Sequence, residues 1–74
     1  MSYYLTLNIR QDIGKRIKKM RVSRKLKQIE VATDAGMTDS YYGKIERGAV
    51  NPSLEKLYRI IRAFKCKSSD ILPF

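Results

Sequence analysis

Two short helical patterns joined by a very tight turn constrain the fold of this chain more than any other feature. The patterns lie within residues 28–47, and only the segment Ala35–Thr38 separates them. Gly36 can adopt the left-handed backbone conformation that ends a helix at little energetic cost. Thr38 can then cap the second helix by accepting a backbone N–H, and Asp39 suits the positive end of that helix dipole. Two helices connected in this way are predicted to form a helix-turn-helix unit.

The length and charge of the chain favour one small domain with a polyanionic partner. Its 74 residues, 1–74, are expected to form a single domain near the lower limit for a self-supporting core. Because so short a chain often gains stability by association, its size favours a dimer. The formal charge is +9, from 16 Lys and Arg against 7 Asp and Glu. A surplus this large favours nucleic acid over a membrane as the partner.

Residue usage leaves little material for catalysis or metal binding. Cys66 is the single cysteine and the chain has no histidine, which excludes an internal disulfide, the usual zinc sites and histidine-dependent nucleophilic triads. We therefore expect no enzyme activity, no metal and no cofactor, and we interpret Cys66 as a small core residue. The first residues do not resemble a signal peptide, and no apolar run approaches membrane-spanning length. A cytoplasmic setting is expected.

The beginning of the chain allows two interpretations. Residues 1–7 alternate weakly between apolar and polar types, which predicts a short strand or an extended arm. A strand would have to pair with its copy on a second subunit, because a lone strand is not stable in water. A partly ordered tail is the alternative. Asn8 and Gln11 resemble a capping box, so the first helix is predicted to start at Asn8 and to run to about Arg24.

Apolar residues at helical spacing extend the pattern to the end of the chain. Ser53 is predicted to cap a fourth helix that ends near Lys65, and Ser68 or Ser69 to cap a last short turn. The fold class is therefore all-α, with five helices in one compact domain. The residues expected to face the core recur at helical spacing: Ile9, Ile13, Ile17, Met20, Ile29, Val31, Ala32, Ala35, Tyr42, Ile45, Leu54, Leu57, Ile60, Ile61 and Phe64.

Specific residue strings add a resemblance to this pattern. The string L-x-Q-x-x-V-A-x-x-A-G-M-T-x-S-Y spans residues 26–41, K-I-E-R-G follows at 44–48, and N-P-S-L at 51–54. Together they resemble the Xre/Cro-repressor family of helix-turn-helix regulators, and the resemblance covers nearly the whole chain. It implies a compact five-helix, lambda-repressor-like DNA-binding domain, with the helix-turn-helix at residues 27–47.

The resemblance implies which residues contact DNA, with the second helix of the unit in the major groove. Lys44 can donate to guanine, and Asp39 can accept from cytosine. Other interpretations stay open: Thr38 and Asp39 could only cap the helix, Tyr41 could simply pack, Arg47 could only be solvated, and Asn51 could cap a turn. The residues expected to face bases are Thr38, Asp39, Ser40, Gly43 and Lys44, and those expected on the DNA backbone are Lys27, Gln28, Tyr41, Arg47 and Asn51.

Two further sets of residues follow from the same resemblance. Arg21 and Glu46 match a pair that joins the first helix to the third and sets the angle of the reading helix. The apolar residues left over near one end are expected to form the dimer interface: Tyr58, Ile61, Leu72 and Phe74.

A dimer of this kind implies a regulator of transcription. Two-fold symmetry would place two reading helices about 34 Å apart on a pseudo-palindromic operator. The expected function is repression or activation, possible autoregulation included, as in restriction-modification controllers or phage-type repressors. RNA polymerase is a further candidate partner, and no small-molecule ligand is expected. The alternatives are an antitoxin that also binds a toxin, and an RNA-binding or scaffolding module that uses only its charge.

Overall fold

Five helices account for most of residues 6–73, the part of the chain that a computed structural model describes. In chain order they are α1 (Leu7–Ser23), α2 (Gln28–Asp34), α3 (Asp39–Glu46), α4 (Leu54–Phe64) and α5 (Ser68–Ile71). Within these residues there is no strand, which confirms the predicted all-α class. None of the described helices is long and apolar enough to cross a membrane.

The N-cap of the first helix lies two residues earlier than predicted. The hydroxyl of Thr6 accepts the backbone N–H of Ile9 at 3.3 Å, so Thr6 is the N-cap and Asn8 lies inside the first turn. The prediction that Asn8 caps α1 is therefore wrong. Thr6 and Leu7, expected in the arm, belong to the start of the helix, while the rest of the expected arm or strand lies outside the described residues. The helix ends at Ser23, close to the predicted end.

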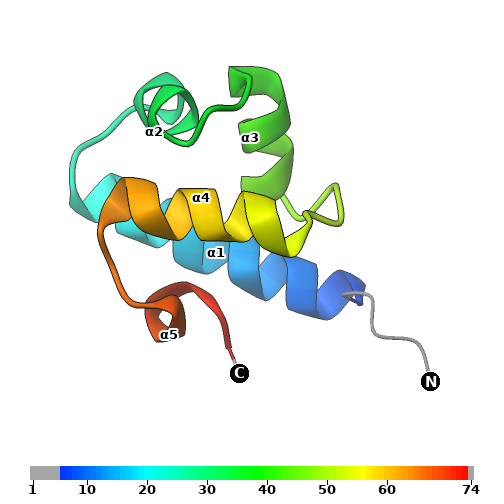
Figure 1. Cartoon of the computed structure of the whole chain (residues 1–74). Coiled ribbons are helices and arrows are strands. Elements are labelled where there is room, and N and C mark those ends of the chain that lie inside the picture. Colours follow the sequence, from blue (N-terminus) through cyan, green and yellow to red (C-terminus); the bar gives the residue numbers. More distant parts are fainter. Residues whose placement is uncertain (1–5, 74) are drawn as a thin grey trace.

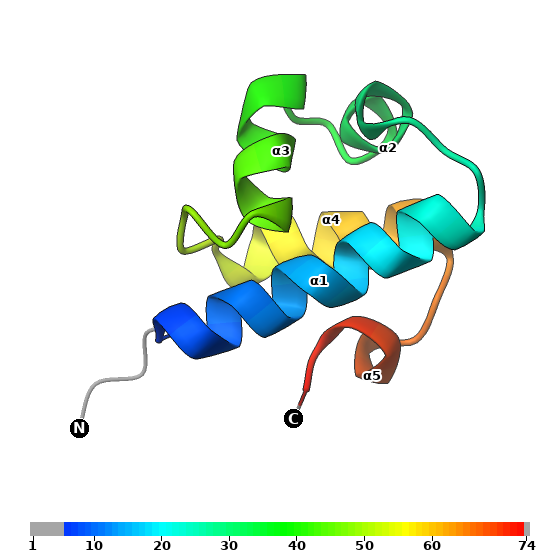
Figure 2. The ribbon, with the colours of Figure 1, turned by 180° about the vertical axis from the view of Figure 1, so that it is seen from behind.

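The helices are arranged so that the helix-turn-helix unit and the last helix occupy opposite sides of the domain. Figure 1 shows α2 and α3 above α1 and α4, with α5 below them. The reverse view in Figure 2 preserves this order, with α3 standing across α1 rather than along it. Helix α3 contacts both α1 and α2, and α5 contacts α1 and α4. The outer face of α3 is thus left for a partner.

One buried cluster draws on all five helices. Three predicted core residues, Ile9, Met20 and Ile61, are only partly buried and pack against this cluster. Two others lie outside it: Ile29 is 50% exposed and Leu54 is 75% exposed. Ile29 lies two positions before Val31, about 200° away around the helix, so both cannot face the core. Leu54 is the first residue of α4, and the burial of its apolar stripe begins one turn later, at Leu57. The buried residues of the cluster are Ile13, Ile17, Val31, Ala32, Ala35, Tyr42, Ile45, Leu57, Ile60, Phe64 and Ile71.

The two C-terminal helices start and end through different devices. The Ser53 hydroxyl accepts the Lys56 N–H at 3.2 Å, which confirms the predicted cap of α4. Lys65 ends α4 in a left-handed conformation with φ of 54°. The N-cap of α5 is Lys67, so the prediction of a serine cap there is wrong. Because a lysine side chain cannot accept a hydrogen bond, Asp70 closes this turn by accepting the Lys67 backbone N–H at 3.0 Å.

Candidate nucleic-acid interface

The turn between α2 and α3 is fixed by the two bonds of a Schellman motif. The N–H of Gly36 donates to the carbonyl of Thr33 at 3.1 Å, and that of Met37 donates to Ala32 at 3.0 Å. Gly36 has φ of +69°, the conformation that a residue with a Cβ adopts only at a cost. The Thr38 hydroxyl then accepts the Tyr41 N–H at 3.1 Å and caps α3. The predicted stop, turn and start are all confirmed.

Lysine occupies the N-cap of α2, where a hydroxyl or carboxylate is preferred. Its side chain has no acceptor, but the backbone N–H of Lys27 donates to the carboxylate of Glu30 at 2.9 Å. Only one of the two bonds of a capping box is therefore made: the side chain of the third helical residue accepts from the backbone of the N-cap residue. The ammonium of Lys27 is left exposed beside the free N–H groups of the first turn. This end of α2 can attract an anion.

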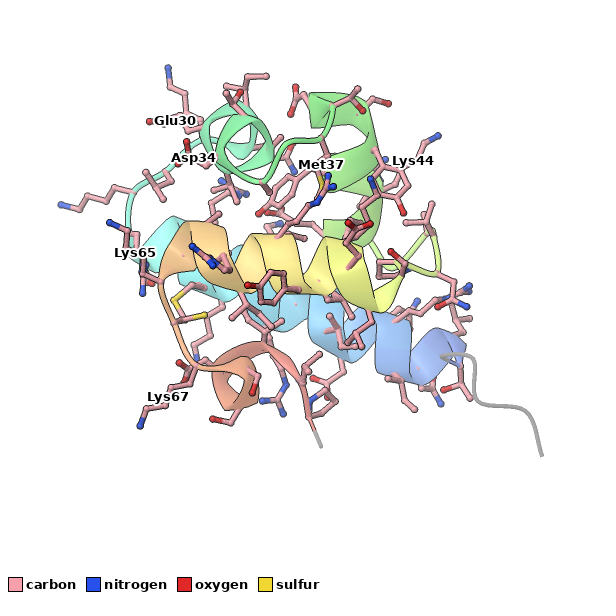
Figure 3. The ribbon with its side chains drawn as sticks, in the orientation of Figure 1. Glu30, Asp34, Met37, Lys44, Lys65 and Lys67 are labelled. Atoms are coloured by element: carbon pink, nitrogen blue, oxygen red, sulfur yellow. The ribbon has the colours of Figure 1, made fainter. Side chains whose placement is uncertain are left out.

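Four of the five residues expected to face bases are exposed on α3 and its cap. They are Thr38, Asp39, Ser40 and Lys44. Lys44 extends from α3 away from the rest of the domain, as Figure 3 shows. It makes no salt bridge with any described residue. Ser40 and Lys44 are four positions apart and so share one face of the helix. This face carries one hydroxyl, one ammonium and, at its beginning, the Asp39 carboxylate.

Gly43 has a different environment from the other four. It is buried, which argues against the predicted contact with bases. A Cβ at this position would lie 3.2 Å from Nη1 of Arg47 and 3.6 Å from Oε1 of Gln28. The missing side chain therefore makes room for two residues that were predicted to bind the DNA backbone. Its role is to let these side chains lie across α3.

The residues expected on the DNA backbone surround the exposed face of α3. Lys27 and Gln28 lie at the start of α2, Arg47 at the C-cap of α3, and Asn51 in the loop before α4. Arg47 and Asn51 are exposed, and Arg47 has no carboxylate partner among the described residues. Tyr41 is partly buried, and the Lys56 ammonium lies 5.8 Å from the centre of its ring. The arrangement leaves cations free on both sides of α3.

The predicted pair between α1 and α3 is present and nearly buried. Nε of Arg21 lies 2.7 Å from Oε2 of Glu46, and Nη2 lies 3.2 Å from Oε1. The side chains of Arg21 and Glu46 are 13% and 2% exposed. A third guanidinium bond, from Nη1 of Arg21, reaches the carbonyl of Leu26 at 2.9 Å. One arginine therefore fixes both the end of α3 and the approach of the chain to α2.

Gln28 also binds this pair, a contact that was not predicted. Its Nε2 donates to Oε1 of Glu46 at 3.0 Å. The carboxylate therefore accepts bonds from α1 and from the first residue of α2, and so holds the helix-turn-helix unit together internally. The 18-residue separation of the two side chains carries no local sequence signal. The one sequence signal for this contact is the glycine at position 43, because its lack of a side chain leaves room for Gln28 to lie across α3.

Burial and hydrogen bonding set the ionisation of this cluster. Burial alone would raise the pKa of the Glu46 carboxyl, but the hydrogen bonds from Arg21 and Gln28 bring it below its ordinary value. The bond to Glu46 raises the pKa of Arg21. Burial raises the pKa of Tyr42, and the Glu46 carboxylate raises it further. The Tyr42 hydroxyl is buried and has no hydrogen-bond partner among the described residues. The carboxylate is thus the only anion of the cluster.

The residues expected at a dimer interface are only partly assembled. Tyr58 is 54% exposed, while Ile61 and Leu72 are partly buried; Phe74 lies outside the described residues. Nη1 of Arg62 donates to the Tyr58 hydroxyl at 3.1 Å, and its guanidinium carbon lies 5.8 Å from the ring centre. This contact holds the tyrosine ring in place on the surface of α4. A second protein surface could cover it.

No described residues form a group of three His, Cys, Asp or Glu side chains that could hold a metal ion. Cys66 is partly buried and packs against the core cluster, in agreement with its interpretation as a packing residue. Burial raises the pKa of its thiol, and Asp70 raises it further. A thiol with a raised pKa is a weak nucleophile at neutral pH.

Comparison with known proteins places these features in a family. A family profile described as helix-turn-helix matches residues 17–71. The control protein C.BamHI of Bacillus amyloliquefaciens is 31% identical over 71 residues, which are 95% of this chain and 88% of that protein. The immunity repressor protein of Bacillus phage phi105 is 40% identical over 60 residues, 81% of this chain but only 42% of the repressor.

Solved structures agree with this placement. The restriction-modification controller protein C.AhdI from Aeromonas hydrophila superposes with a TM-score of 0.82 at 27% identity. The match covers 85% of this chain and 96% of the controller. The correspondence therefore extends beyond α2 and α3 to most of the domain.

Proposed function

The chain belongs to the helix-turn-helix family of transcriptional regulators, and we propose that it binds a specific double-stranded DNA operator as a homodimer. The observation that carries this proposal is the way α3 is presented. Arg21, Gln28 and Glu46 fix the helix from behind, while its outer face exposes Ser40 and Lys44. A rigid helix with an exposed polar face, flanked by unpaired cations, is suited to the major groove.

Base reading and backbone binding are divided between different residues in this proposal. Lys44 donates to guanine, and Asp39 accepts from the exocyclic amine of cytosine, because Thr38 rather than Asp39 caps α3. Lys27, Gln28, Arg47 and Asn51 bind phosphates on either side, and Tyr41 lies against the sugar–phosphate backbone. The net charge of +9 supports this arrangement, because phosphate neutralisation supplies much of the affinity of such complexes.

The homodimer is proposed to form through the surface of α4 and α5. Tyr58 is the most exposed of its proposed residues that the structure describes, and Ile61 and Leu72 are partly buried against the core. Phe74 is proposed to extend the same surface. A two-fold axis here would separate the two reading helices by about one turn of DNA, roughly 34 Å, and require a pseudo-palindromic operator.

Similarity to two restriction-modification control proteins supports a controller-type regulator. The chain spans 88% of the control protein C.BamHI and 96% of C.AhdI, but less than half of the phage repressor. By analogy with such controllers, we propose regulation by protein concentration, autoregulation included. The effect would be exerted on RNA polymerase at the regulated promoter. The proposed place of action is the cytoplasm, where the operators of bacteria lie.

Selection of bound duplexes from a random pool tests the DNA-binding proposal. The expected result is one pseudo-palindromic sequence, preferred over random duplex by about 10³-fold or more. The affinity should fall steeply with salt, with a slope of about −0.9 per phosphate neutralised. Equal affinity for all duplexes would instead indicate that the protein binds nucleic acid through its charge alone, without sequence specificity. Duplex RNA of the selected sequence serves as the control ligand.

A paired substitution tests the proposed interface. Tyr58→Asp places a charge in the centre of the apolar surface and should shift sedimentation at micromolar concentration from dimer to monomer. Val22→Asp is the matched control, because Val22 is 56% exposed on α1. It should leave the dimer intact. Dimerisation that survives Tyr58→Asp would place the interface elsewhere.

A further inference from the structure

A groove-like cavity of about 500 Å³ lies between α1 and the helix-turn-helix unit. Its lining combines residues of three helices and the α3 C-cap: Gln11, Lys15, Lys18, Gln28, Glu46 and Arg47. Two of them, Gln28 and Arg47, already belong to the proposed backbone contacts. The three residues from α1 do not belong to any of the predicted DNA contacts. The cavity therefore connects a new surface to the DNA-binding one.

The α1 side of the cavity is a single stripe of the helix. Gln11, Lys15 and Lys18 are spaced four and three residues apart, so their side chains project from one face. This stripe runs beside Gly14, where the helix meets α3. A Cβ at Gly14 would come within 2.6 Å of the Ile45 carbonyl oxygen, so the two backbones are in contact. The stretch of backbone that carries both lysines is therefore held against α3.

The other end of the cavity is fixed in a similar way. Gly48 follows α3 with φ of +70°, and a Cβ there would lie 2.8 Å from Cγ of Gln11. Direct contact between α1 and the α3–α4 loop therefore closes this end. Figure 2 shows α1 passing across the base of α3 on this side of the domain.

The charges in the cavity are positive and unpaired, except for one neutralised carboxylate. Lys15, Lys18 and Arg47 make no salt bridge with any residue in 6–73. Glu46 contributes a negative charge, but Arg21 binds both of its oxygens and Gln28 binds one. Three cations that converge on an open groove from two helices match a phosphate in charge and in hydrogen-bonding capacity.

We propose that this cavity binds one phosphate of the DNA backbone, with Lys15 and Lys18 of α1 as phosphate-binding residues. The inference rests on the proposed DNA-binding function and extends it to a helix outside the helix-turn-helix unit. A phosphate between the α1 lysines and Arg47 continues the row of contacts that Lys27 and Gln28 begin. The bound group is a phosphodiester of the operator duplex itself rather than a free anion.

A double-mutant cycle between protein and DNA tests the proposal. The Lys15→Gln/Lys18→Gln variant is titrated with the selected operator and with operators in which single phosphates are replaced by neutral methylphosphonates. The salt slope of the variant should be smaller than that of the wild type by about 0.9 for each phosphate that the variant no longer neutralises. At one phosphate position in each half-site, the methylphosphonate should lower the operator affinity of the wild type but leave the affinity of the variant unchanged. The base preference of the variant should stay the same.

Lys65→Gln/Lys67→Gln is the matched control, because it removes the same charge from the far side of the domain. Both lysines are exposed, and Figure 3 shows them away from α3. This control should retain the wild-type sensitivity to every methylphosphonate. Inorganic phosphate added at constant ionic strength distinguishes a free anion from DNA: it should not displace the operator from the wild type more than chloride does.

The outcomes separate the inference from the function on which it rests. The phosphate site would be overturned if the affinity losses from the lysine substitutions and from the methylphosphonate added up at every phosphate position. It would also be overturned if the variant had the same salt slope as the wild type. Specific operator binding by the wild type would stand in both cases. Displacement by inorganic phosphate in the wild type but not in the variant would assign the cavity to a free anion and also overturn the inference. A wild type without sequence preference would overturn the proposed function itself.

Discussion

The guanidinium of Arg21 holds the carboxylate of Glu46 through two bonds, of 2.7 and 3.2 Å, across the junction between α1 and α3. Glu46 does not lie on the exposed face of α3, and its side chain is 2% exposed. It therefore affects DNA binding through the orientation of the helix. Such a buried pair says more about a unique arrangement than about net stability, since two charges must be desolvated to form it.

Glu46→Ala should weaken both folding and operator binding, without removing a DNA contact. The change leaves the buried guanidinium of Arg21 uncompensated, which typically costs about 3–5 kcal/mol. Urea unfolding measures the loss of stability, and operator titration at low temperature measures the affinity of the remaining folded protein. Wild-type stability together with wild-type affinity would contradict the role assigned to the pair. Asp34→Ala, which removes an exposed carboxylate that makes no salt bridge with any described residue, is the control.

The same carboxylate should make stability depend on pH. The folded-state pKa of Glu46 is lowered, so its contribution is fully present above the unfolded value of about 4.3 and is lost as pH falls through the folded value. The wild type should exceed Glu46→Gln in stability by a few kcal/mol at pH 7, and this gap should shrink toward pH 3. Other carboxylates titrate equally in both proteins and cancel in the difference. A gap that stays constant with pH would contradict the lowered pKa.

Gly14→Ala should separate α1 from α3. An alanine Cβ would lie 2.6 Å from the Ile45 carbonyl oxygen and closer still to that of Glu46, and neither backbone atom can move alone. Helix propensity favours alanine over glycine by about 1 kcal/mol, so a loss of stability must come from this overlap. We expect a net loss of about 1–3 kcal/mol in urea unfolding. Lys19→Ala, at an exposed position of the same helix, should change stability by less than about 0.5 kcal/mol.

Lys65 should be replaceable by glycine with a gain in stability. Its φ of 54° places it in the left-handed region, which costs a residue with a Cβ about 1–2 kcal/mol. Lys65→Gly should therefore be more stable than Lys65→Ala by about 1 kcal/mol, although both remove the same charge. At Lys67, where φ is −82°, alanine should instead be at least as stable as glycine. Thermal unfolding of the four variants measures these differences. If glycine and alanine ranked in the same order of stability at both positions, the proposed backbone strain at Lys65 would be contradicted.

The features that could be predicted from sequence are those with local chemistry. Gly36, Thr38 and Ser53 act on backbone groups within a few residues, and each does what its position predicts. The start of α1 was misplaced because Thr6 and Asn8 are both suitable caps, two residues apart, and the pattern does not choose between them. The beginning of the chain was then assigned to an arm that is in part helix.

Features that depend on distant parts of the chain were predicted less well. Ile29 and Leu54 are apolar and at plausible spacing, but their burial depends on whether another helix covers them. The family resemblance places Gly43 on the reading face, whereas the side chains of Gln28 and Arg47 lie over it. The bond from Gln28 to Glu46 joins residues that are far apart in sequence. Only the family resemblance identifies the pair of Arg21 and Glu46, because its separation of 25 residues is larger still.

Lys44 and Arg47 offer a direct test of the division between base reading and phosphate binding. Lys44 projects from the outer face of α3, whereas Arg47 lies across its end beside Gly43. Lys44→Ala should cost about 1–3 kcal/mol at guanine-containing positions and relax the preference there, while Arg47→Ala should weaken all duplexes alike and reduce the salt slope by about 1. Repeating the duplex selection with each variant measures both effects. A changed half-site for Arg47→Ala, or an unchanged one for Lys44→Ala, would reverse the assignment of the two side chains.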